Sequence, residues 1–432
     1  MNEVLIVHHH EITLKGDNRG YFEAQLMRNI RTVVADYLTA DHIKGGYGRF
    51  IIHLEHDMPQ DEILTRVKRV FGLSNICVGV RVPQDVQSFC LAAEDLLKMQ
   101  SFNTIRVDTR RPDKRFPVNS MEVNRRVGEF LCNRFGVRAD LTSPDQTVYI
   151  EIADGNAFVY LHKLPGLGGL PVGTSGKLIS LLSAGFDSPV ASWMMMRRGA
   201  VVRGVHFHSL PYTGAESVDQ VRQLVQCLAQ YQMGMKLYLV PFAPIQQEIV
   251  RQAPQQLRVI LYRRMMVRIA ETIASREKAE GLVTGESVGQ VASQTLRNIR
   301  VIDDAATLPI YRPLSGTDKE EIIGIARKIG THDISKEPYD DCCSFLAPRK
   351  PETWGDLDMT RRVERDLNYP QLISDTLAHV TKEVYNYPSS IRDMHDDTMD
   401  SPDLDQDDLK PDLLSDHFHK GEADADENYR QE

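Results

Sequence analysis

Residues 183–188, Ser-Ala-Gly-Phe-Asp-Ser, lie where an apolar run meets a helical pattern. The run Leu178–Leu182 is typical of a buried strand, and Pro189 suits the first turn of a helix. This order places backbone N–H groups and two hydroxyls at a helix N-terminus, which attracts phosphate. Asp187 is a candidate ligand for a metal ion that bridges phosphates. A plain strand–turn–helix with a serine cap is the competing interpretation.

The chain after the hexapeptide alternates apolar runs with amphipathic helical patterns. Continuous apolar strands of this kind predict a doubly wound parallel sheet that is covered by helices on both faces. Open α/β sheets bind ligands beyond the carboxyl ends of their strands, so we expect a site there. The predicted strands of this sheet are Leu178–Leu182, Val201–His206, Leu237–Val240 and Gly281–Thr284.

Two smaller α+β units are predicted before this domain. Residues 1–56 contain a strand at Val4–Val7, helical spacing over Tyr21–Leu38 and a second strand at Phe50–Leu54. Residues 57–165 alternate strands and helices and end in a hairpin around Asp154-Gly155-Asn156. The predicted division is therefore 1–56, 57–165, a Gly-rich linker at 166–176, a parallel-sheet domain at 177–395, and a tail at 396–432.

The net charge of −9 conceals an uneven distribution. Residues 396–432 hold 14 acidic and 3 basic residues, which leaves 48 basic and 46 acidic residues in the rest of the chain. The tail is poor in apolar residues and is predicted to be disordered, either as a solubility segment or as a brake that competes with a polyanionic partner. The body is slightly basic, so the overall charge does not exclude a nucleic-acid partner.

Membrane and secreted classes are disfavoured. No run of about 18 apolar residues lacks a charge or a breaker, and the N-terminus has no basic region or cleavage site typical of a signal peptide. Six cysteines in 432 residues are too few for a disulfide framework. We expect a cytoplasmic protein without a membrane segment.

The hexapeptide resembles the Ser-Gly-Gly-x-Asp-Ser loop of the PP-loop ATPases, which cleave ATP between its α and β phosphates. Ala184 replaces the first glycine. If that position needs a positive φ, alanine weakens phosphate binding; if it needs only a small residue, alanine is harmless. The second alternative is favoured because the rest of the motif is intact.

Longer blocks resemble the tRNA 4-thiouridine synthetases, the ThiI family. The resemblance covers roughly residues 1–390 in matching order and includes an N-terminal ferredoxin-like unit and a THUMP domain. It does not extend to the rhodanese domain that longer members carry. The blocks are residues 10–19, 205–208, 263–266, 281–296, 312–314, 318–320 and 338–343.

The resemblance implies ATP and Mg2+ as cofactors. Taken alone, His206 is better interpreted as a satisfied strand-end histidine, and Arg263 as one cation on a solvated helix face. No separate metal site is predicted, because no Cys/His cluster has zinc spacing and His8-His9-His10 alternates between faces of a strand. The implied ATP site consists of Leu181, Leu182, Ser183, Gly185, Asp187, Ser188, His206, Phe207, Arg263, Gly285 and Gln294.

The catalytic residues implied by the resemblance are Cys342, Cys343, Asp187 and Lys319. A cysteine at Cys342 would accept sulfur as a persulfide, which requires an accessible thiolate. Without a rhodanese domain, the relay uses Cys343 or an external thiol. A buried cysteine pair is the alternative. Lys319 begins a helical stretch and would reach phosphate or the developing charge on uracil, or else it is simply solvated.

The unit at 57–165 resembles a THUMP RNA-binding domain. Residues 106–138 hold nine Lys or Arg against four Asp or Glu, which suits phosphate contacts, although a solvated charged face is the simpler alternative. The candidate RNA contacts are Arg106, Arg110, Arg111, Lys114, Arg115, Arg125 and Arg126.

Together these features predict an ATP-dependent tRNA sulfurtransferase that adenylates uridine 8 and replaces the adenylate with persulfide sulfur, giving 4-thiouridine. A cysteine desulfurase would supply the sulfur. The resemblance also implies sulfur transfer to the thiamine-pathway sulfur carrier protein, and a homodimer. The alternatives are another PP-loop tRNA-modifying enzyme and a non-catalytic tRNA-binding protein.

Overall fold

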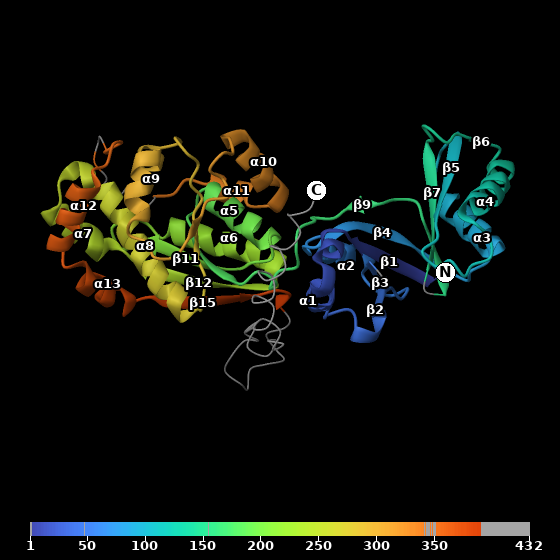
Figure 1. Ribbon diagram of the computed structural model, residues 1–432, viewed down its shortest axis with the longest axis horizontal. Helices are drawn as coiled ribbons and strands as arrows, with labels where there is room; N and C mark the ends of the chain where they lie inside the picture. Colours follow the sequence, from blue (N-terminus) through green and yellow to red (C-terminus); the bar gives the residue numbers. More distant parts are fainter. Residues whose placement is uncertain are drawn as a thin grey trace, which may run out of the picture. The chain divides into compact units, whose positions relative to one another are not determined.

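The computed structural model describes residues 2–46, 48–153, 155–340, 342, 346, 348 and 351–389. The predicted disordered tail at 396–432 and the candidate Cys343 lie outside these residues. The described chain forms two sheets, which are each covered by helices (Figure 1).

The N-terminal sheet has nine strands and runs without a break through both predicted α+β units. Its strand order is β2-β3-β1-β4-β8-β7-β5-β6, with β9 paired to β4. The elements are β1 (Asn2–His9), η1 (Glu11–Asn18), α1 (Arg19–Val33), β2 (Ile43–Gly46), β3 (Arg49–His53), α2 (Gln60–Val67), β4 (Leu73–Val82), α3 (Val86–Leu97), β5 (Thr104–Arg110), α4 (Ser120–Phe135), β6 (Arg138–Ala139), β7 (Gln146–Ala153), β8 (Asn156–Tyr160) and β9 (Leu164–Pro165).

Strand β4 is the element that joins the two units. It pairs antiparallel with β1 on one side and with β8 on the other. One core lies under α1 and α2 and includes Leu26 and Ile63, whereas a second lies under α3 and α4 and includes Phe89 and Val127. Because α2 packs in the first core, residues 60–67 lie with the unit that the sequence ended at residue 56.

The C-terminal sheet has six strands in the order β14-β13-β10-β11-β12-β15. Its strands are β10 (Lys177–Leu181), β11 (Val201–His208), β12 (Gly234–Pro241), β13 (Leu282–Val283), β14 (Ile310–Tyr311) and β15 (Thr381–Asn386). All neighbours are parallel except β15, which pairs antiparallel with β12. The predicted doubly wound parallel sheet is confirmed, with an antiparallel edge strand that the sequence did not indicate.

Helices cover both faces of the C-terminal sheet. One core is formed with α5 (Asp187–Arg197), α6 (Glu216–Gln232) and α10 (Lys319–Ile329). The opposite core is formed with α7 (Ala243–Gln252), α8 (Arg258–Arg276) and α9 (Leu296–Asp303), and partly buried residues of α12 (Leu357–Asp366) and α13 (Tyr369–Leu377) pack against it. The remaining short helices are η2 (Ala40–His42), η3 (Gln255–Leu257), η4 (Ala292–Gln294) and α11 (His332–Lys336).

The direction of strand order changes next to β10. Strands β11 and β12 follow on one side of β10, whereas β13 and β14 lie on its other side. Such a reversal opens a crevice beyond the carboxyl ends of the strands, where open α/β sheets bind ligands. The hexapeptide at 183–188 follows β10 directly and therefore lies at this crevice.

Candidate active site

The loop after β10 is closed by one serine. The backbone N–H of Ser183 donates to Ser188 Oγ at 2.8 Å, and Ser188 Oγ donates to the carbonyl of Ser183 at 3.2 Å. Ser188 is buried in the first turn of α5. This hydroxyl holds the loop in a compact turn in front of the helix N-terminus, as phosphate binding requires.

Ala184 fits the loop without strain. Its side chain is fully buried in the core under α5, and its backbone is not among those with positive φ. The position therefore uses a small residue and does not use the conformational freedom of glycine. This geometry supports the alternative in which alanine is harmless.

Gly285 is required by a close approach of two backbones. A Cβ at this position would lie 2.5 Å from the backbone nitrogen of Ser188 and 2.7 Å from the carbonyl carbon of Asp187. Neither atom belongs to a flexible side chain, so a larger residue would push the loop after β13 away from the hexapeptide. Glycine here brings the ends of β10 and β13 together.

Asp187 is held by two side chains from other segments. Its Oδ1 accepts from Lys319 Nζ at 2.7 Å, and its Oδ2 accepts from Gln290 Nε2 at 3.1 Å. Lys319 is the first residue of α10, as the sequence predicted, and its Nζ lies 5.4 Å from the centre of the Phe186 ring. The predicted catalytic pair of Asp187 and Lys319 therefore forms one ion pair at the loop.

His206 is a buried, neutral histidine that faces the pocket. Its Nδ1 lies 2.9 Å from the carbonyl oxygen of Leu182, and burial lowers its pKa to about 4. With the proton on Nδ1, the ring donates to that carbonyl and leaves Nε2 as an acceptor. Nε2 is buried and has no hydrogen-bond partner among the described residues, so the site offers it to a ligand.

A group of charged residues that the sequence analysis did not select lies behind Arg263. Glu286 is 3% exposed, and its carboxylate lies 2.6 Å from Arg312 Nε, 3.0 Å from Thr284 Oγ1 and 3.9 Å from Arg263 Nη1. Arg312 also pairs with Asp303. Both Glu286 and Arg312 belong to blocks of the family resemblance, so those blocks were the signal that could have identified them.

One pocket brings the predicted ATP residues together at the carboxyl ends of β10, β11 and β13. Ten of the eleven predicted residues line it, and Gly185 lies in the same loop, with space for a Cβ limited by Tyr339 Oη at 3.2 Å. The lining adds four residues that were not predicted, namely Met266, Thr284, Glu286 and Tyr339. The pocket residues are Leu181, Leu182, Ser183, Asp187, Ser188, His206, Phe207, Arg263, Met266, Thr284, Gly285, Glu286, Gln294, Tyr339 and Cys342.

Cys342 lines the same pocket as the nucleotide residues. The residue is 8% exposed, and its carbonyl accepts from Gln246 Nε2 at 2.7 Å. The sequence alone left open whether this cysteine is buried and inert or faces the chemistry. It is both buried and part of the pocket lining.

The donor set suits a magnesium ion that is held mainly by phosphates. Asp187 places a carboxylate at the loop, and the described residues contain no group of three or more His, Cys, Asp or Glu that could form a metal cage. Mg2+ is commonly bound by one or two carboxylates together with substrate phosphates. Asp187 would hold such an ion, which would neutralise phosphate charge.

Most of the candidate RNA contacts are exposed but already paired. Arg125 and Arg126 both contact Glu122, and their hydrogen bonds lower the pKa of Glu122 to about 2. Arg115 pairs with Asp113, whose pKa is likewise lowered to about 2.

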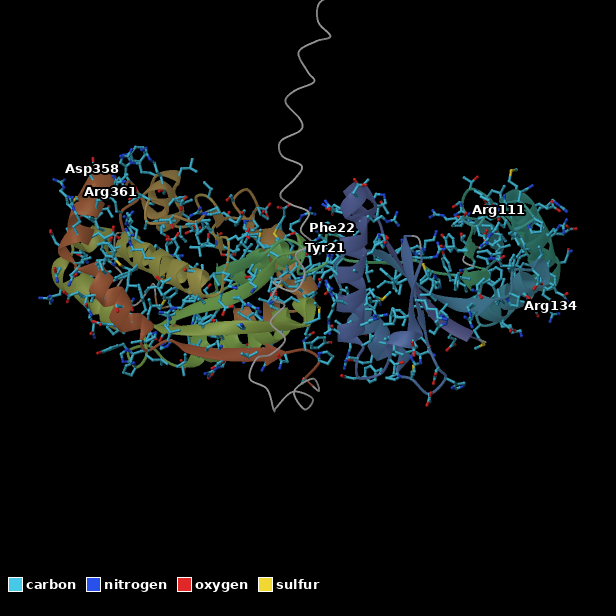
Figure 2. All side chains as sticks on the ribbon, turned by 60° about the horizontal axis from the view of Figure 1, so that its bottom comes forward. Tyr21, Phe22, Arg111, Arg134, Asp358 and Arg361 are labelled. Carbon is cyan, nitrogen blue, oxygen red and sulfur yellow. The ribbon has the colours of Figure 1, made fainter. Side chains whose placement is uncertain are left out.

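Two further candidates are committed to backbone carbonyls. Arg111 donates to the carbonyls of Phe116 and Val118, and Arg106 donates to that of Leu141. Arg110 and Lys114 are exposed without an ion pair to a described residue. Figure 2 shows Arg111 on the unit that carries α3 and α4, with Arg134 on the same unit.

Comparison with known proteins identifies the family. Residues 173–369 match the family described as thiamine biosynthesis protein (ThiI), residues 4–77 match the ThiI ferredoxin-like domain, and residues 84–162 match the THUMP domain. A probable tRNA sulfurtransferase of Caldanaerobacter subterraneus subsp. tengcongensis is 43% identical over 87% of this chain and 98% of its own length. The chain belongs to the ThiI family.

Other relatives agree with this ThiI assignment. A probable tRNA sulfurtransferase of Moorella thermoacetica is 40% identical over 87% of this chain and 96% of its own length. The crystal structure of a 4-thiouridine synthetase–RNA complex with bound ATP matches with a TM-score of 0.82 and 34% identity, covering 89% of this chain and all of that one. A Pyrococcus horikoshii structure matches with a TM-score of 0.60 and 26% identity over 76% of this chain and all of that one. The predicted family and fold are confirmed.

In the part of this ThiI-family chain that the structure describes, no helix is long and apolar enough to cross a membrane.

Proposed function

We propose that this chain is an ATP-dependent tRNA sulfurtransferase that converts uridine 8 of tRNA to 4-thiouridine. The observation that carries the proposal is the shared pocket. The phosphate loop at 183–188, the buried acceptor of His206 and the sulfur-bearing Cys342 all line it. Adenylation and sulfur transfer need the nucleotide and the thiol within reach of one base, and this arrangement supplies both.

The first step is adenylation. The loop and the N-terminus of α5 bind the phosphates of ATP, and His206 Nε2 accepts a hydrogen bond from the adenosine. O4 of the uracil attacks the α phosphate, and pyrophosphate leaves. Asp187 would hold a Mg2+ ion, which would supply charge neutralisation, and Lys319 orients the Asp187 carboxylate through their ion pair.

The second step is sulfur transfer. A cysteine desulfurase would load Cys342 with a terminal sulfur as a persulfide. This terminal sulfur attacks C4 of the base, the C4–O4 bond breaks, and AMP leaves with O4. A second thiol then attacks Cys342 Sγ, which releases 4-thiouridine and leaves a disulfide that an external dithiol must reduce. Cys343 is the second thiol in this proposal, and an external thiol is the alternative.

The THUMP unit would bind the tRNA by shape and phosphate charge. We further propose a homodimer and a second activity, sulfur transfer to the thiamine-pathway carrier protein. Both follow from family membership and from no contact described above.

A reconstitution tests the reaction. Purified protein, unmodified tRNA, ATP–Mg2+, cysteine and a cysteine desulfurase are combined, and the digested tRNA is analysed by mass spectrometry. We expect 4-thiouridine at position 8. The variant C342S should still adenylate tRNA and release pyrophosphate but should form no thiouridine, and C227S, which removes a half-buried cysteine at the carbonyl of Ile329, is the matched control.

The outcomes separate the alternatives. A different thiolated base would favour another PP-loop tRNA-modifying enzyme. Neither AMP nor thiouridine would favour a non-catalytic tRNA-binding protein. If C343S abolishes thiolation and C342S does not, Cys343 and not Cys342 carries the persulfide.

A further inference from the structure

Four large apolar side chains are exposed beside the nucleotide pocket, on the loop before α9, at the first residue of α9 and on the loop before α12. Val288 is 42% exposed, Val291 50%, Leu296 71% and Trp354 70%. Scattered apolar residues are ordinary on a protein surface, but a group of them beside a site indicates an interaction surface. We call these four residues, together with Arg297, the rim.

The two loops of the rim are fixed to each other by one buried side chain. Asn298 is fully buried, and its Nδ2 donates to the carbonyls of Ala292 and Glu352, both at 2.7 Å. Its Oδ1 accepts from the backbone N–H of Gly355 at 2.9 Å. The carbonyl of Thr353 also accepts a hydrogen bond from Thr295 at 2.9 Å. The exposed apolar residues therefore stand on a preorganised surface.

The rim is also continuous with the pocket. Gln294 lines the pocket and lies two residues before Leu296. The segment that carries Trp354 is joined to this loop by the hydrogen bonds of Asn298 to the carbonyls of Ala292 and Glu352. The loop before α9 thus connects the reaction site to the exposed surface.

Trp354 and Arg297 form a cation–π pair. The guanidinium carbon of Arg297 lies 5.0 Å from the centre of the Trp354 ring, and Arg297 Nε donates to the carbonyl of Gly355 at 3.2 Å. The ring keeps most of its surface exposed. An aromatic ring beside an arginine is the platform on which proteins stack unpaired nucleobases.

Two arginines at the rim are available to a polyanion. Arg297 and Arg300 are exposed and form no ion pair with a described residue. The neighbouring acids are engaged: Asp303 pairs with Arg312, and Asp304 pairs with Arg361, which Figure 2 shows on the same domain as Asp358. The carboxylate of Glu352 accepts the backbone N–H groups of Thr353 and Trp354.

We propose that the rim is where unpaired bases of tRNA next to the target uridine stack during the reaction. This inference rests on the proposed function. A uracil that enters the pocket must leave its own stack, which has an unfavourable free energy of unstacking. Stacking of the flanking bases on Trp354 would offset that free energy, and Arg297 and Arg300 would contact the adjoining phosphates.

The two tryptophans of the chain make the contact directly measurable. Trp193 is 3% exposed, so acrylamide quenching of the full-length protein reports mainly Trp354. We expect unmodified tRNA, added without ATP, to lower Trp354 fluorescence and to protect it from acrylamide. The variant W354A should lower kcat/KM for tRNA thiolation by about ten-fold, whereas W354F should keep most of it, because one stacked base has roughly that effect.

The controls separate stacking from folding and from nucleotide binding. W354A should leave the KM for ATP unchanged. M99A removes another exposed apolar residue, 92% exposed and far along the chain in the N-terminal sheet unit, and should leave tRNA thiolation unchanged.

Two results would overturn the proposal. One is tRNA that leaves Trp354 fluorescence unchanged while W354A thiolates at the wild-type rate. The other is protection of Trp354 by the cysteine desulfurase and not by tRNA, which would make the rim a protein-docking surface. Protection by tRNA without any thiouridine product would support the rim and refute the proposed reaction, so the two failures are distinguishable.

Discussion

The nucleotide pocket and the arginine-rich surface at 106–138 use the same interactions to opposite effect. In the pocket, Leu182 holds His206 Nδ1, and Gln290 and Lys319 hold Asp187, so each bond aims a functional group at the cavity. On α4, Glu122 binds Arg125 and Arg126, so each bond engages charge that a polyanion would otherwise meet. The number of basic residues in a sequence therefore overstates the positive charge that a surface offers to a polyanion. A sequence motif, in turn, does not reveal the hydrogen bonds from other segments that hold its side chains in place.

The largest effect should come from breaking the pocket at Asp187. D187A removes the carboxylate that joins Lys319 and Gln290 at the phosphate loop. Loss of one preorganised electrostatic group commonly lowers a rate by about 10² to 10³-fold, and we expect a decrease of that size in AMP formation. Release of AMP during tRNA addition measures it.

Asp333 provides the matched control for this experiment. Its carboxylate is exposed and pairs with the neighbouring His332. D333A should keep wild-type AMP formation. A D187A variant within two-fold of wild type would refute the assigned role of Asp187.

The next effect should come from Gly285, where two backbones meet. G285A places a methyl group against Ser188 N and should displace the loop, and overpacking of this kind typically has an effect of about 1–3 kcal/mol. We expect ATP affinity, measured by calorimetry, to fall by roughly 10 to 100-fold. G316A, at a glycine with open space around it, should bind ATP normally.

A moderate effect should appear in the pH dependence of stability. His206 has a pKa of about 4 in the folded chain, against about 6.5 when unfolded. Between these values the unfolded state binds a proton that the folded state excludes, so the free energy of unfolding falls as pH drops below about 6.5.

At pH 5 this loss is about 2 kcal/mol relative to pH 7. H206N keeps a donor for the carbonyl of Leu182 and does not titrate, so its decrease should be smaller by that amount. Urea unfolding at both pH values measures the difference. Equal slopes in the two proteins would show that His206 is not the titrating group.

The smallest effects should come from the arginine-rich surface, where they distinguish free cations from cations that are already paired. Lys114 is exposed without an ion pair to a described residue, so K114A should reduce the salt dependence of tRNA binding by about one unit of slope. R125A removes a cation that Glu122 and Glu129 already engage and should change affinity less. Filter binding over a range of salt concentrations measures both. A larger loss in R125A would mean that tRNA displaces the glutamates.

Local sequence signals predicted the regular elements well. The helical stretch predicted to begin at Lys319 is observed as α10, because Asp318 caps it and Gly330 ends it. Strand β15 was missed because its side chains lie at a partly exposed edge and alternate weakly. The unbroken nine-stranded sheet was missed because β4 pairs with β1 and β8, which are both distant from it in the sequence.

The residues of the site could be predicted where they belong to a sequence motif. Residues 183–188 and the block at 281–296 gave most of the pocket, but nothing local indicated that Tyr339 or Met266 would line it. Nor could the sequence show which arginines of 106–138 are paired, because those pairs depend on side-chain geometry. Ala184 became interpretable only once its backbone conformation was known.

The antiparallel strand β15 has a consequence for how the chain is made. It covers the edge of β12, from Gly234 opposite Asn386 to Leu239 opposite Thr381, across roughly 140 intervening residues. At typical rates of synthesis, about 5–20 residues per second, the edge of β12 stays unpaired for roughly 7 to 30 seconds before β15 has been synthesised. During that interval the nascent domain presents an open strand edge, which favours association with other chains. Slow translation downstream of residue 241 would lengthen this exposure, so synonymous codon choice in that stretch should affect the yield of folded enzyme.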